Sequence, residues 1–101
     1  MTVLRLGMTG ANGRMGRALQ SLLQDDARFE LAALIGSSSE WNNVSPLDVV
    51  IDFSTREGFD AALTHCRANG VALVAGTTGL DAGQRAAMQS AARDIPILYA
   101  A

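Results

Sequence analysis

Short apolar runs alternate with segments of helical periodicity along this chain, and no other sequence feature constrains its fold as strongly. The apolar runs are rich in Val, Ile, Leu and Ala and lack regular polar alternation, which predicts strands buried on both faces of a parallel sheet. Strands that alternate with helices indicate βαβ units. We expect five strands, at residues 3–8, 31–35, 49–53, 71–75 and 97–100.

Three of the intervening segments place apolar residues at the spacing of one helical face. The second helix is predicted to begin at the capping box Ser54-Thr55-Arg56-Glu57 and to end at Asn69-Gly70. Asp81 with Gln84 forms a similar start signal for the third helix. The three apolar stripes consist of Met15, Ala18, Leu19, Leu22 and Leu23, then Phe59, Ala62, Leu63 and Cys66, then Met88, Ala91, Ala92 and Ile95.

Residues 36–46 are polar and aperiodic, and we predict a loop there because roughly ten residues are too few for a complete crossover unit. The expected architecture is an α/β fold of the Rossmann type. It has a parallel sheet of about five strands in the order 2-1-3-4-5, right-handed crossovers and three helices. A chain of 101 residues has room for one domain, which we place at residues 1–101.

The run Gly10-Ala11-Asn12-Gly13-Arg14-Met15-Gly16 follows the first strand directly and opens the first helix. In a dinucleotide-binding turn, the first glycine permits the sharp turn, the second lets backbone amides approach a pyrophosphate, and the third lets the helix pack closely. The helix N-terminus then presents unpaired N–H groups to the phosphates. Because GxxGxxG departs from the commoner GxGxxG, a purely structural tight turn is the alternative.

Small and hydroxylated residues follow three other strands, which suits a ligand lying against the backbone. In an open α/β sheet, ligands bind outside the carboxyl ends of the strands. We therefore expect Phe53 and Ser54, Gly76 to Thr78, and Ala100 with Ala101 to border the cofactor site. The segment 76–79 is alternatively an ordinary turn.

The end of the second strand lacks the acidic residue that would bind the ribose hydroxyls of NAD. The hydroxyls of Ser37 to Ser39 and the guanidinium of Arg14 would instead suit the 2′-phosphate of NADPH. We therefore expect NADPH or NADH as cofactor, with NADPH favoured. Alternatively, the serines form a solvated loop and Arg14 is simply exposed.

Composition excludes several other functions. All eight basic residues are arginine, so the chain has no P-loop lysine, no Schiff-base lysine and no complete short-chain dehydrogenase site. A net charge of −2 without basic runs argues against nucleic acid, and no apolar stretch approaches a membrane span. One histidine and one cysteine make a metal site improbable. The single cysteine and the absence of a signal-peptide pattern predict a cytoplasmic location.

Four further residues have competing interpretations. We expect His65 to be a surface or flanking histidine and Cys66 to be a core residue on the apolar stripe. Asp52 lies near a strand end, and hydrogen bonding to backbone amides is favoured over catalysis. Trp41 either covers an adenine ring or packs on the sheet edge.

Four motifs, in the same order and spacing, resemble the nucleotide-binding part of the 4-hydroxy-tetrahydrodipicolinate (dihydrodipicolinate) reductase family. The resemblance covers essentially the whole chain, and its Gly-Arg-Met-Gly and Gly-Thr-Thr-Gly segments are the most specific. The motifs are the turn 10–16, Val50-Ile51-Asp52-Phe53-Ser54 followed by Glu57-Gly58, Val74-Ala75-Gly76-Thr77-Thr78-Gly79-Leu80, and Ile97-Leu98-Tyr99-Ala100-Ala101.

This resemblance implies hydride transfer from NAD(P)H to a cyclic unsaturated dicarboxylate in diaminopimelate and lysine biosynthesis. By resemblance, residues 10–15 line the pyrophosphate and adenosine, 76–78 the nicotinamide side, and Ala100 and Ala101 the floor beneath it. Phe53 and Ser54 add cofactor contacts. The complete reductase is expected to be a homo-oligomer.

Three departures from the family pattern matter, one of which is that the segment after the second strand is shorter than in many members. The family's ribose-binding acid is replaced by Ile35, and the basic residue that some members use for NADPH is replaced by Gly36. Nothing matches the family's substrate domain, with its histidine-rich run and Ser-Gly-Thr loop. We therefore interpret the chain as a fragment of a larger reductase, with no catalytic residues and no turnover of its own. The alternatives are a non-enzymatic dinucleotide sensor, or the N-terminal half of another dehydrogenase.

Overall fold

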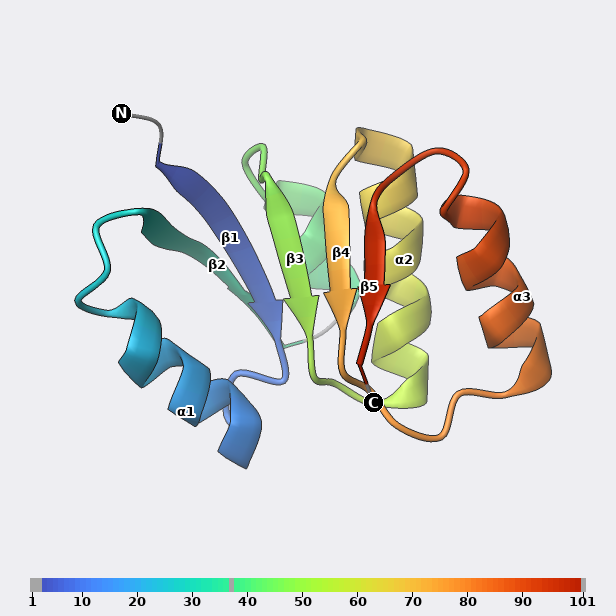
Figure 1. Cartoon of the computed structure of the whole chain (residues 1–101), viewed down its shortest axis with the longest axis horizontal. Coiled ribbons are helices and arrows are strands. Elements are labelled where there is room, and N and C mark those ends of the chain that lie inside the picture. The colour runs from blue at the N-terminus through green and yellow to red at the C-terminus, as the bar shows by residue number, and fades with distance from the viewer. Residues whose placement is uncertain (1–2, 37, 101) are drawn as a thin grey trace.

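The computed structural model describes residues 3–36 and 38–100, and their five parallel strands form one sheet in the order β2-β1-β3-β4-β5 (Figure 1). This confirms the predicted fold class and strand order. The elements, in chain order, are β1 (Leu4–Thr9), α1 (Arg14–Leu23), β2 (Phe29–Ile35), the 3₁₀ helix η1 (Ser38–Asn43), β3 (Val49–Asp52), α2 (Arg56–Asn69), β4 (Ala72–Ala75), α3 (Ala82–Ala91) and β5 (Ile97–Tyr99).

The parallel register brings the carboxyl ends of the strands to one edge of the sheet, at the bottom of Figure 1. There Thr9 pairs with Asp52, Asp52 with Ala75, and Ala75 with Tyr99. On its other side, Thr9 pairs with Ile35 at the end of β2. Segments far apart in sequence therefore follow the strands into the same region.

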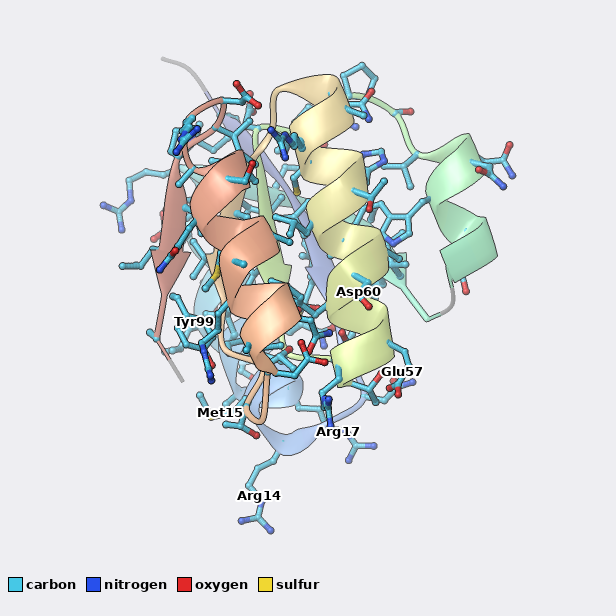
Figure 2. All side chains as sticks on the ribbon, turned by 90° about the vertical axis from the view of Figure 1, so that its right-hand side faces the viewer. Arg14, Met15, Arg17, Glu57, Asp60 and Tyr99 are labelled. Carbon is cyan, nitrogen blue, oxygen red and sulfur yellow. The ribbon has the colours of Figure 1, made fainter. Side chains whose placement is uncertain are left out.

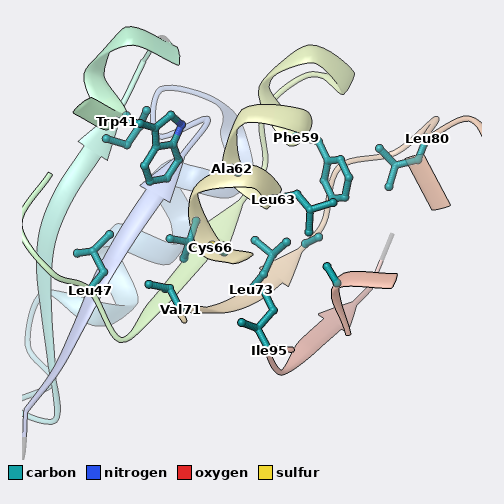
Figure 3. Packing of buried hydrophobic residues seen from close by; sticks show 14 residues of the cluster. Trp41, Leu47, Phe59, Ala62, Leu63, Cys66, Val71, Leu73, Leu80 and Ile95 are labelled. Atoms are coloured by element: carbon teal, nitrogen blue, oxygen red, sulfur yellow. The ribbon is translucent and has the colours of Figure 1, made fainter. Parts of the chain in front are cut away.

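Helices lie on both faces of the sheet. α1 packs near β2, whereas η1, α2 and α3 lie on the opposite face (Figure 1). The main core forms beneath α2, where its apolar stripe meets the buried side chains of β3 and β4 (Figure 3). Phe59, Ala62 and Cys66 of that stripe are fully buried, which confirms Cys66 as a core residue.

The boundaries of the second and third helices are specified locally. Asp81 and Gln84 form the predicted reciprocal capping box: Gln84 N donates to Asp81 Oδ1 at 2.7 Å, and Asp81 N donates to Gln84 Oε1 at 3.1 Å. Gly70 ends α2 with a left-handed φ of 66°. These two predictions are confirmed.

The predicted start of α2 was wrong by one residue. Thr55, and not Ser54, is the N-cap, and its Oγ1 accepts a hydrogen bond from Gly58 N at 3.1 Å. The Ser54 hydroxyl instead donates a hydrogen bond to the carboxylate of Asp52.

Two other predictions need correction. Residues 36–46 are not wholly loop, because η1 occupies part of them. In α1, Met15 and Leu22 are 60% and 75% exposed, so the predicted apolar stripe is not a buried face. The buried residue of α1 is Gly16, because this helix meets the chain closely at the turn before it.

Candidate functional site

The turn between β1 and α1 requires glycine at two positions. Gly10 has a φ of 66°, and a Cβ at this residue would lie 2.3 Å from the carbonyl oxygen of Phe53. A Cβ on Gly16 would lie 2.3 Å from the carbonyl oxygen of Gly10. The sharp turn at Gly10 agrees with the sequence pattern. The nearest neighbours of a Cβ on Gly16 are atoms of the turn itself, so this glycine lets α1 pack closely on the turn.

The N-terminus of α1 is left without a side-chain cap. Its N-cap is Gly13, which has no side chain to accept a hydrogen bond from the first turn of the helix. The positive end of the helix dipole and its uncapped amides therefore favour an anion at this position. Asn12, Gly13 and Arg14 are exposed, so a ligand can approach the turn.

Two hollows lie along this turn at the carboxyl edge of the sheet. The larger, of about 630 Å³, extends toward the end of β2. The smaller, of about 260 Å³, extends toward the segment after β4. The residues that line the larger hollow are Gly10–Gly13, Leu34–Gly36, Glu40, Phe53–Thr55 and Gly58. Those that line the smaller are Gly10, Gly13–Gly16, Phe53, Ser54 and Gly76–Thr78.

Most of the predicted cofactor residues therefore meet at one place. Gly10, Ala11, Asn12, Gly13, Arg14, Met15, Phe53, Ser54, Gly76, Thr77 and Thr78 each line at least one hollow. Ala100 lines neither, but its N–H donates to Ala75 O at 2.9 Å, which holds it beside the end of β4. Ser37 and Ala101 lie outside the described residues.

Beneath the two hollows, the carboxylate of Asp52 is completely buried. It accepts hydrogen bonds from three side-chain hydroxyls: that of Thr9, that of Ser54 at 2.6 Å, and that of Thr77 at 2.6 Å. Our expectation of backbone amides as partners was wrong. The hydroxyls follow or end three adjacent strands, so Asp52 joins the segments that border both hollows.

Tyr99, at the end of β5, is a residue that the sequence analysis missed. Its hydroxyl donates a hydrogen bond to the carbonyl oxygen of Thr77 at 3.2 Å. This contact holds the segment after β4 from the side opposite Asp52. A tyrosine at the end of an edge strand carried no sequence signal for such a role.

The charged residues near the hollows are not arranged as predicted. Arg14 borders the smaller hollow and projects away from the fold at the start of α1 (Figure 2). The larger hollow, on the β2 side, is bordered by Glu40 of η1. Glu40 was not among the predicted site residues, because an acid was expected directly after the second strand and Glu40 lies five residues further along the chain.

Trp41 and His65 lie away from both hollows. Their rings stack with centroids 4.5 Å apart, and Trp41 is buried in the core beside α2 (Figure 3). Trp41 therefore borders neither hollow and is not placed to cover an adenine ring there, and η1, which carries it, contacts the edge strand β2. His65 is half-buried, and desolvation lowers the pKa of its imidazole. It is a flanking histidine, as expected.

The described residues, 3–36 and 38–100, provide neither a metal-ligand cluster nor a membrane-spanning helix. They contain no group of three or more His, Cys, Asp or Glu side chains that could hold a metal ion. None of the helices at residues 3–36 and 38–100 is long and apolar enough to cross a membrane.

Comparison with known proteins agrees with this geometry. The sequence model described as "Dihydrodipicolinate reductase, N-terminus" matches residues 4–101. The chain belongs to the dihydrodipicolinate reductase family. The 4-hydroxy-tetrahydrodipicolinate reductase of Campylobacter lari is 41% identical over 99 residues, which are 97% of this chain and 41% of that protein. The Xylella fastidiosa (strain 9a5c) reductase is 39% identical over 111 residues, covering 95% and 47%.

A solved structure of the same family has the same fold. The dipicolinate-bound dihydrodipicolinate reductase from Paenisporosarcina sp. TG-14 matches with a TM-score of 0.69 at 22% identity, over 91% of this chain and 43% of that one. This chain therefore spans less than half the length of these relatives and corresponds to the N-terminal part of the family. Membership separates it from the other dehydrogenases whose N-terminal half was considered as an alternative.

Proposed function

We propose that this chain is the NAD(P)H-binding domain of a reductase of the dihydrodipicolinate reductase type. The observation that carries the proposal is the Gly10–Gly16 turn, whose uncapped helix N-terminus lies between two hollows at the carboxyl edge of the sheet. Backbone amides of this turn are suited to the pyrophosphate. The two hollows are then available to the two halves of the dinucleotide.

The residues present fit such a cofactor. The larger hollow, between the turn and the end of β2, suits the adenosine half. The smaller hollow, bordered by Gly76 to Thr78, suits the nicotinamide half. When bound, the cofactor supplies the hydride, and the protein supplies binding and orientation. Asp52 and Tyr99 hold the segments that border the nicotinamide half.

The complete reductase is proposed to reduce a cyclic unsaturated dicarboxylate, in line with the relatives named 4-hydroxy-tetrahydrodipicolinate reductase. Its place in the diaminopimelate and lysine pathway is what the family resemblance implies. Substrate binding, proton delivery and exclusion of water are assigned to parts beyond these 101 residues. We therefore expect no turnover by this chain by itself. The one-domain assignment, cytoplasmic location and homo-oligomeric assembly of the complete enzyme stay predictions.

Equilibrium titration of the chain with NADH and with NADPH tests this proposal, using the fluorescence of the reduced nicotinamide. Saturable binding of at least one cofactor with 1:1 stoichiometry is expected. Adenosine is the control for weak stacking: added as a competitor at the concentration of the cofactor, it should not displace the bound cofactor, because it lacks the pyrophosphate. If neither NADH nor NADPH binds, the proposal is wrong.

A further inference from the structure

Glu40 occupies a position in the fold that its place in the sequence does not suggest. It follows the end of β2 by five residues, but η1 turns the chain so that Glu40 borders the larger hollow. A Cβ on Gly36 would lie 3.2 Å from Glu40 Oε1. The carboxylate of Glu40 therefore lies beside Gly36, directly after the last residue of β2.

An acidic group at this point has a defined chemical consequence in a dinucleotide-binding sheet. The end of β2 is where the adenine ribose lies, and a carboxylate there accepts hydrogen bonds from its 2′-hydroxyl. A 2′-phosphate brings a charge of about −1.5 to −2 to the same place, which a carboxylate repels and an arginine attracts. The sign of the charge beside Gly36 therefore distinguishes the two cofactors.

The described residues that line the larger hollow include no basic side chain. Arg14, which was expected to bind a 2′-phosphate, borders the smaller hollow on the other side of the turn. The hollow that suits the adenosine thus has one charged lining residue in the described part of the chain, Glu40, and it is negative.

We propose that Glu40 recognises the adenine ribose and makes this chain prefer NADH to NADPH. The inference rests on the proposed function, since it assigns the adenosine to the larger hollow. It reverses the preference expected from the sequence, because the fold provides a carboxylate where the local sequence pattern had none.

The test uses two probe pairs that differ only in the 2′-phosphate: NADH with NADPH, and ADP-ribose with 2′-phospho-ADP-ribose. The second pair lacks nicotinamide and so reports on the adenosine end alone. Calorimetry of the unchanged chain should show that the unphosphorylated member of each pair binds more tightly. The dissociation constants should differ by roughly tenfold, which is the affinity that one charge-assisted hydrogen bond contributes.

Glu40→Gln removes the charge and keeps the shape of the side chain. It should weaken NADH and ADP-ribose binding and strengthen binding of both 2′-phosphorylated probes, so that the preference falls by roughly tenfold. Glu30→Gln is the matched control. It removes the same charge from β2, where Glu30 pairs with Arg5 away from the hollows, and it should leave the preference unchanged.

Partial unfolding of the variant would weaken the binding of both probes in a pair. It therefore cannot explain an affinity that falls for the unphosphorylated probe and rises for the 2′-phosphorylated one. The inference is overturned if the unchanged chain prefers NADPH, or if Glu40→Gln and Glu30→Gln shift the preference equally. If the unchanged chain binds neither cofactor, the proposed function itself is contradicted. The two failures are therefore distinguishable.

Discussion

Thr77 donates a hydrogen bond of 2.6 Å to the buried carboxylate of Asp52, although 25 residues separate them in sequence. This bond joins the segment after β4 to the end of β3. Asp52 also accepts from Thr9 and Ser54, so one carboxylate connects three neighbouring strand ends. A buried carboxylate is stable only when its oxygens are hydrogen-bonded, and here hydroxyls provide those bonds.

Thr77→Val should lower the free energy of unfolding by about 1.5–3 kcal/mol, because it removes a hydrogen bond to a buried charged group. It should also weaken cofactor binding, since Thr77 borders the smaller hollow. Urea unfolding and cofactor titration measure the two effects. Thr64→Val, on the exposed surface of α2, is the matched control and should change neither. Unfolding free energies that agree for both variants would contradict the assigned role of Thr77.

Gly10→Ala and Gly70→Ala form a second matched pair, because both glycines have a φ of 66°. Each substitution should cost about 1–2 kcal/mol in backbone strain alone. A Cβ on Gly70 has no atom within 4 Å, whereas one on Gly10 meets Phe53 O at 2.3 Å. Gly10→Ala should therefore lose cofactor binding and be less stable than Gly70→Ala, which should retain binding. Thermal unfolding and titration of both variants test this, and equal binding by the two would contradict it.

Burial raises the pKa of the Cys66 thiol to about 12, and the negative charge of Asp52 adds to the shift. A thiol whose pKa is higher in the folded protein than in the unfolded chain stabilises the fold below the unfolded pKa. That stabilisation is lost as the pH rises. Between about pH 9 and about pH 11 the loss should be about 2 kcal/mol.

Urea unfolding of the protein and of Cys66→Ala across this alkaline range measures the effect. The difference in unfolding free energy between them should shrink as the pH rises, because only the unchanged protein loses the contribution of the thiol. Taking the difference removes the titration of other groups common to both proteins. A difference that is constant with pH would show that Cys66 ionises normally in the folded state.

Desolvation lowers the pKa of His65, whose ring stacks on Trp41, the only tryptophan of the chain. A depressed histidine pKa means that stability falls when the imidazole is protonated, as the pH drops below the unfolded value of about 6.5. Trp41 emission should change with a midpoint below that value, because protonation places a cation against the indole face. His65→Phe retains a stacked ring and should remove the transition. A midpoint at or above the unfolded value would contradict the prediction.

Much of the fold was predictable because its determinants are local. The absence of polar alternation in the runs around Val50 and Leu73 indicated strands covered on both faces, and the helical spacing of Phe59, Ala62 and Cys66 indicated a buried helical face. The prediction for α1 failed at Met15 and Leu22, which are exposed. Periodicity describes which residues share a face, but not how much of that face another element covers.

The sequence by itself determined the strand–helix alternation, the order of the strands and the glycine turn at residues 10–16. These features depend on residues close together in the chain and on the handedness of parallel crossovers. The tertiary structure decided the partners of Asp52, which lie up to 43 residues away, and the sides of the turn on which Arg14 and Glu40 lie. Such contacts depend on where packed elements bring distant side chains, and neither spacing nor composition specifies that.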